Sequence, residues 1–202
     1  MSGILPAGVL RAHYSFGALH QALQPPHAFL ALAQATEVLQ NLKKFLILAT
    51  SYNKMIQIFS DQYFMKIALQ QALQAQEAGE VPIGAVLVHG KTILAKTYNQ
   101  TELLTDVTAH AEILAITAAA NQLNSKYLKE CTLYVSLEPC IMCAGALHWS
   151  QIGKLVYAAE DPKQGFMRYG KELLHPKTKL QYGLMADEAG MLLKEFFARR
   201  RK

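Results

Sequence analysis

The chain has 202 residues, only three of them cysteine, and a formal net charge of +5 at pH 7. The low, odd cysteine count excludes a disulfide-stabilised scaffold and favours a reducing compartment, so we expect a cytoplasmic protein. The length allows one domain with a substantial core plus an appendage, and the positive charge suits an anionic partner.

Residues 1–54 differ in composition from the remainder, being rich in alanine, leucine and glutamine. The pattern over residues 28–49 predicts an amphipathic helix, whose polar positions interrupt any apolar run long enough to span a bilayer. The segment also lacks the layout of a secretory signal, so no membrane association is expected. We predict that translation starts at Met55, which leaves residues 55–202 as the working domain. The alternative is a helical extension or an anchor of unknown purpose, and N-terminal mass analysis of the natural protein tests the predicted start.

The next elements are a helix and a hairpin. Ser60 or Asp61 can cap a helix that runs to about residue 78 and ends at Gly79. Residues 81–88 form an apolar stretch typical of a strand, and residues 92–98 are expected to return as the second strand of a hairpin.

Helices and strands alternate in the rest of the chain. We predict a helix over residues 108–120, a strand over 131–136, a helix over 140–149 opened by Pro139, and a strand over 152–158. A final helix over residues 187–199 is expected to bury Leu192, Leu193, Phe196 and Phe197. This order predicts an α/β fold, namely a three-layer α/β/α domain with a mixed central sheet.

Two short motifs carry the chemistry: His-Ala-Glu at residues 110–112 and Pro-Cys-Ile-Met-Cys at residues 139–143. Imidazole nitrogen and thiolate sulfur are preferred ligands of zinc. Catalytic zinc sites stop at three protein ligands and leave a place for water. The sequence therefore predicts a catalytic zinc site formed by His110, Cys140 and Cys143, with Glu112 free to move the protons of that water.

A structural zinc site would need a fourth ligand, and Cys131 is the only other thiol. Residues 131–135 have the pattern of a buried strand, so we predict that Cys131 belongs to the core. The combination H-x-E and P-C-x-x-C is the signature of the zinc nucleobase deaminases.

These motifs and the predicted architecture resemble the cytidine deaminase-like superfamily, and within it the bacterial tRNA-specific adenosine deaminases. The resemblance covers roughly residues 64–201 and rests on the stretches 80–88, 108–113 and 133–146, extended by 161–163 and 195–200.

The resemblance implies hydrolytic deamination of adenosine to inosine at the wobble position of a tRNA anticodon, with arginine tRNA as the expected substrate. Water activated by one zinc ion per subunit would be the nucleophile, and Glu112 the proton shuttle. The implied partners are the tRNA anticodon stem-loop and a second copy of the chain in a homodimer.

Two rival functions remain open at this point. One is a zinc deaminase of a free base or nucleotide, of the guanine or cytosine type. The other is a non-catalytic zinc-bearing nucleic-acid binder, against which Glu112 argues, because a structural zinc site has no use for an acid/base group.

The resemblance also implies two substrate-binding residues. Asn99 would hydrogen-bond the target base, and its alternative role is to close the loop after a strand. Asp161 would lie near the sugar of the target nucleotide, and its alternative role is a turn carboxylate. Basic side chains are candidates for phosphate contacts, although those at the chain end also suit a helix C-terminus: Lys163, Arg168, Lys171, Arg199, Arg200, Arg201 and Lys202.

Overall fold

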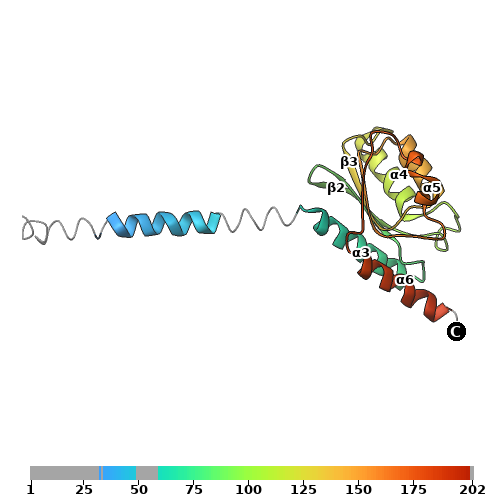
Figure 1. The fold of residues 1–202 in the computed structure, drawn as a ribbon, viewed down its shortest axis with the longest axis horizontal. Helices are drawn as coiled ribbons and strands as arrows, with labels where there is room; N and C mark the ends of the chain where they lie inside the picture. The colour runs from blue at the N-terminus through green and yellow to red at the C-terminus, as the bar shows by residue number, and fades with distance from the viewer. Residues whose placement is uncertain (1–31, 33, 49–58, 201–202) are drawn as a thin grey trace, which may run out of the picture. The chain divides into compact units, whose positions relative to one another are not determined.

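The structure is a computed structural model that describes residue 32 and residues 34–48 and 59–200 (Figure 1). The chain divides into two units, residues 1–54 and 55–202, and each is considered by itself. In the first unit, residues 34–48 are helical and exposed. Among the described residues, no helix is long and apolar enough to cross a membrane. The predicted start at Met55, and the candidate phosphate ligands Arg201 and Lys202, lie outside the described residues.

The second unit alternates helices and strands as predicted. In chain order it contains α3 (Asp61–Glu77), β1 (Gly84–His89), β2 (Thr92–Tyr98), α4 (Ala111–Leu123), β3 (Cys131–Leu137), α5 (Ile141–Trp149), β4 (Lys154–Ala159), the 3-10 helices η1 (Phe166–Tyr169) and η2 (Lys171–Leu173), β5 (Lys179–Tyr182) and α6 (Ala186–Arg200). The sheet has five strands in the order β2-β1-β3-β4-β5. β1 is antiparallel to β2 and β3, whereas β3, β4 and β5 are parallel. The predicted mixed sheet is therefore confirmed.

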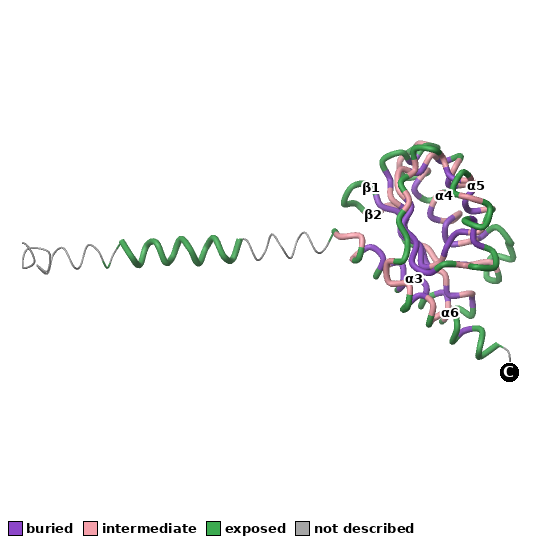
Figure 2. The backbone as a smooth tube through the Cα atoms, in the orientation of Figure 1, coloured by how far each residue is buried: buried purple, intermediate pink, exposed green. Residues whose placement is uncertain are grey.

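The buried residues form two core clusters, which the strands separate. Figure 2 colours these buried stretches purple along the backbone. In β1, Ala85 and Leu87 pack on one face with α4 and α5, while Val86 and Val88 pack on the other with α3 and α6. This alternation follows from the two-residue period of a strand. Because both faces are covered by helices, the domain has three layers, as expected.

The helix α3 begins and ends where the sequence predicts. The Ser60 hydroxyl accepts a hydrogen bond from the Tyr63 amide at 3.1 Å, as an N-cap should. Gly79 follows the helix with φ of +80°, a conformation that glycine adopts without strain.

Two details of the sequence prediction were wrong. α4 begins at Ala111, three residues later than expected, and His110 is its N-cap. In the final helix Phe196 is buried but Phe197 is 45% exposed, so only one of the two aromatic rings belongs to the core. The strand β5 and the 3-10 helices were not anticipated, because β5 is an edge strand of only four, mostly exposed residues, too short for its alternation of polar and apolar residues to be distinctive.

Gly84 permits the close packing of α3 on β1. A Cβ atom at this position would collide with the backbone of Ala68, Gln71 and Ala72. We therefore expect Gly84→Ala to lower the free energy of unfolding by about 1–3 kcal/mol, the usual cost of overpacking a core. The matched control is Gly190→Ala in α6, where a Cβ would meet no atom within 4 Å. The control should raise stability by about 0.5–1 kcal/mol. Denaturant unfolding measures both, and an unchanged midpoint for Gly84→Ala would contradict this packing.

Candidate active and metal-binding site

The site forms where two helices begin. His110 is the N-cap of α4, and Cys140 is the N-cap of α5, each with extended backbone. Cys143 lies in the first turn of α5. The amide of Gln100 donates to the carbonyl of Ala109 at 3.0 Å, which ties the loop after β2 to the residue that precedes His110. The two motifs, about thirty residues apart in sequence, meet where the His110 ring approaches the sulfurs of Cys140 and Cys143.

His110, Cys140 and Cys143 form a group of potential metal ligands, whose ligand atoms all lie within 4.8 Å of one another. His110 Nδ1 lies 3.7 Å from Cys140 Sγ and 3.5 Å from Cys143 Sγ. In a tetrahedral zinc site with usual bond lengths, nitrogen and sulfur ligands stand about 3.6 Å apart. The donor atoms and their spacing therefore fit a zinc ion, and the three sequence-predicted ligands do meet.

The pKa values of Cys140 and Cys143 are shifted in opposite directions. A hydrogen bond from Cys143, together with His110, lowers the pKa of Cys140 to about 4, against the opposing effect of burial. The same hydrogen bond, aided by burial, raises the pKa of Cys143 far above its usual range. A divalent cation bound between the two sulfurs would favour the thiolate form of both.

Glu112 lies in the first turn of α4 and is only 3% exposed. Burial raises the pKa of its carboxyl group, against hydrogen bonding to its own backbone amide and the nearby His110. Its Oε2 atom is buried and has no hydrogen-bond partner among the described residues. An unpartnered buried carboxylate oxygen is costly, so it indicates a place for a group that the protein alone does not supply.

Asn99 lies directly after β2 and is 3% exposed. Its amide nitrogen Nδ2 donates to Glu80 Oε2 at 3.0 Å and to Thr101 Oγ1 at 3.1 Å. Its backbone amide donates to the carbonyl of Ile83 at 2.9 Å. The side chain is thus held in a polar network next to the loop that leads to His110, and its contact with substrate stays a prediction.

Asp161 makes the turn that was its alternative role. Its Oδ1 accepts hydrogen bonds from the amides of Lys163 at 2.9 Å and Gln164 at 3.1 Å. Its own amide donates to Glu138 Oε2 at 2.9 Å. Asp161 therefore shapes the loop after β4, and its role toward the sugar stays a prediction.

Two buried carboxylates that the sequence analysis did not single out hold these loops. Glu138 is 6% exposed, and besides Asp161 it accepts from the amide of Met167 at 2.8 Å. A Cβ on Gly165 would collide with the Glu138 carboxylate, so this loop needs glycine there. Glu80, 1% exposed, serves the loop after β2 in the same way. The available signal was a charged residue adjoining an apolar segment: Glu80 precedes Val81, and Glu138 follows Leu137.

Several candidate phosphate ligands are engaged within the protein. Arg168 donates to the carbonyl of Lys163, and Arg200 to that of Gly79. Arg199 lies 3.7 Å from Glu195, one helical turn away. All three side chains therefore have partners within the protein, and their contact with phosphate stays a prediction.

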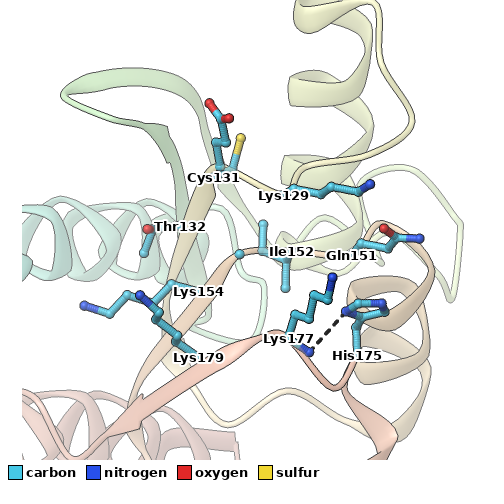
Figure 3. A pocket seen from close by; sticks show the side chains of 11 residues that line it. Lys129, Cys131, Thr132, Gln151, Ile152, Lys154, His175, Lys177 and Lys179 are labelled. Atoms are coloured by element: carbon cyan, nitrogen blue, oxygen red, sulfur yellow. Dashed lines mark hydrogen bonds between the residues drawn. The ribbon is translucent and has the colours of Figure 1, made fainter.

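A cleft of about 470 Å³ opens at the amino ends of β3, β4 and β5, the opposite end of these strands from Cys140 (Figure 3). Four lysines and a histidine line it, together with the acidic Glu130: Lys129, Lys154, His175, Lys177 and Lys179. Lys154 is paired with Asp61 at 2.7 Å between Nζ and Oδ2. The cleft shares no residue with the metal-ligand group, so it is separate from the candidate reaction centre.

Comparison with known proteins shows that the chain is similar to deaminases. The profile of the MafB19-like deaminase family matches residues 59–201. The curated tRNA-specific adenosine deaminase of Aquifex aeolicus (strain VF5) is 46% identical over 145 residues, which cover 69% of this chain and 95% of that protein. The protein of the same description from Bacillus subtilis (strain 168) is 41% identical over 147 residues, covering 70% and 91%.

Solved structures of deaminases are also similar to this chain. One from a study of A-to-I editing by tRNA:A34 deaminases at the wobble position of transfer RNA matches with a TM-score of 0.62 and 41% identity, covering 65% of this chain and 99% of that chain. The guanine deaminase from Nitrosomonas europaea matches with a TM-score of 0.61 but only 26% identity, covering 69% and 85%. The fold is common to both, and the sequence is nearer to the first.

Proposed function

Because the chain belongs to the family of tRNA-specific adenosine deaminases, within the MafB19-like deaminases, we propose that it deaminates adenosine to inosine in tRNA. The observation that carries the proposal is the group of three metal-ligating side chains, in a chain 46% identical to such an enzyme. We propose further that the target is the wobble adenosine in the anticodon of arginine tRNA. The 41% identity to a tRNA:A34 deaminase supports the wobble position.

In this proposal His110, Cys140 and Cys143 hold one zinc ion in each subunit. As a Lewis acid, zinc makes water acidic enough to be a nucleophile near neutral pH. Glu112 takes a proton from the attacking water and delivers it to N1 of the purine, as the water oxygen bonds to C6. Glu112 then carries the second water proton to the exocyclic nitrogen, whose bond to C6 breaks. One water enters and one ammonia leaves, so the step needs no other reactant.

The burial of Glu112 supports this role. The carboxyl group is 3% exposed, and its Oε2 has no hydrogen-bond partner among the described residues, so this oxygen is available to accept a proton. Asn99 and Asp161 are proposed to contact the base and the sugar of the target nucleotide. A base in a single-stranded anticodon loop is easily unstacked, so it can enter such a buried site at low cost.

We further propose that residues 55–202 are the catalytic domain and that the protein works as a homodimer in the cytoplasm. The family match over residues 59–201 supports the domain. Large apolar side chains on α5 support self-association, since Trp149 is 80% exposed and Ile141 is 52% exposed.

The test is a panel of substrates given to the zinc-loaded chain: an anticodon stem-loop RNA, adenosine, guanine and cytidine. We expect inosine from the RNA and no turnover of the three small molecules, with products identified by mass spectrometry. Turnover of guanine or cytidine alone would overturn the proposal in favour of the free-base alternative.

A further inference from the structure

Glu80 is a buried carboxylate on which three hydrogen-bond donors converge. It lies between α3 and β1 and is 1% exposed. Its Oε1 accepts from the amide of Leu103 at 2.8 Å. Its Oε2 accepts from Asn99 Nδ2 at 3.0 Å and from the Thr101 hydroxyl at 3.3 Å. A carboxylate that receives three donors is satisfied as an acceptor, and it has nothing to donate.

This network determines which end of the Asn99 amide faces inward. Only the NH2 group of Asn99 can face an acceptor-only carboxylate, and its second hydrogen goes to Thr101 Oγ1 at 3.1 Å. Both amide hydrogens are therefore used. The carbonyl oxygen Oδ1 makes neither of these bonds, and within the described residues it is free to accept one from another molecule.

The network also stands beside the metal-ligand group. The Thr97 hydroxyl donates to the carbonyl of Ala111 at 2.7 Å, and the Gln100 amide to the carbonyl of Ala109 at 3.0 Å. Thr97 and Gln100, which flank Asn99 in sequence, thus contact the backbone carbonyls of the two residues adjacent to His110.

We infer that Glu80 is a positioning residue, which fixes the amide of Asn99 so that Oδ1 is presented to the substrate as a hydrogen-bond acceptor. The inference rests on the proposed function and on the substrate contact of Asn99. An acceptor here matches a donor of the nucleobase, such as an exocyclic amine or a protonated ring nitrogen, and repels a carbonyl group. Glu80 would thus act on recognition without touching the base.

Glu80→Gln is the informative change. The carbonyl of the new glutamine must accept from the Leu103 amide, because two N–H groups cannot face each other. Its own NH2 group then faces Asn99, which must turn its amide over to accept. The Asn99 NH2 group would then replace Oδ1 toward the substrate, so a donor would meet a donor.

The experiment is a double-mutant cycle in the full zinc-loaded chain, with Glu80→Gln, Asn99→Ala and the double variant. Glu80→Gln should lower kcat/KM on the stem-loop RNA by about tenfold, the value of one misplaced hydrogen bond. In the Asn99→Ala background, the same change should lower it by less than about twofold, because the group that Glu80 positions is gone. Zinc content should be unaffected throughout.

The matched control is Glu138→Gln, another buried carboxylate that accepts two backbone amides but does not touch Asn99. Glu138→Gln should change kcat/KM by the same factor in the wild-type and Asn99→Ala backgrounds. A Glu80→Gln effect that persists in the Asn99→Ala background, or a single variant with wild-type kcat/KM, overturns the inference. If the wild-type chain deaminates guanine instead of RNA, the proposed function fails. The double-mutant cycle is then run with guanine as the substrate. Glu80→Gln should again lower kcat/KM in the wild-type background and have little effect in the Asn99→Ala background.

Discussion

Replacing Glu112 with alanine or glutamine should lower kcat for tRNA deamination by at least about 1,000-fold, within the range that general acid–base groups contribute. Zinc content should stay at the wild-type level, because Glu112 is not among the three grouped ligands. Single-turnover assays on the stem-loop RNA, with metal analysis of the same samples, measure both quantities. Wild-type-like turnover in either variant would remove Glu112 from the mechanism.

The glutamine variant adds a readout of stability. In the metal-free protein the buried Oε2 atom of Glu112 has no partner among the described residues, so the native state bears its desolvation cost. Glu112→Gln keeps the volume and removes the charge. We expect the free energy of unfolding to rise by about 1 kcal/mol while activity is lost, as is usual for a group kept for function. A large loss of stability would instead indicate a structural role.

Replacing Cys143 with alanine should abolish both zinc binding and deamination. Its Sγ lies 3.5 Å from His110 Nδ1, in the geometry of a shared ion. We expect zinc affinity to fall by more than about 100-fold, because loss of a mere supporting hydrogen bond to a ligand already costs about 10- to 100-fold. Competition with a chromogenic chelator measures the affinity.

The matched control is Cys131→Ala, which also removes one thiol. Cys131 is buried at the start of β3 and lies in a core cluster, not in the metal-ligand group. This variant should keep its zinc and its activity, with some loss of stability from the smaller side chain. If Cys143→Ala kept one zinc per chain after dialysis, the assigned ligand set would be wrong.

The candidate metal ligands could be predicted from the sequence because the prediction needs only residue types at short spacings. Few functions other than metal binding with acid–base chemistry require histidine, glutamate and cysteine in the combination H-x-E and P-C-x-x-C. In the structure the three candidate ligands lie together. The hairpin and the three layers could also be predicted from the sequence. Val86 and Leu87 belong to opposite core clusters, as the two-residue period of a strand requires.

What sequence reasoning missed depends on contacts between distant segments. Glu80 accepts a hydrogen bond from Asn99, nineteen positions away, and Glu138 accepts one from Met167, twenty-nine positions away. No local pattern reveals such pairs. β5 has the same origin, because it exists by parallel pairing with β4 rather than by its own periodicity. The exposure of Phe197 likewise depends on where α6 lies, which helical spacing alone does not determine.

Position-resolved mapping of inosine tests the central claim most directly. The full zinc-loaded chain is incubated with arginine tRNA bearing a wobble adenosine, and the RNA is digested and read by mass spectrometry. The account predicts inosine at the wobble position alone, with none in a tRNA whose wobble adenosine is replaced by guanosine. Unmodified adenosine at that position, with the protein folded and carrying its zinc, would contradict it.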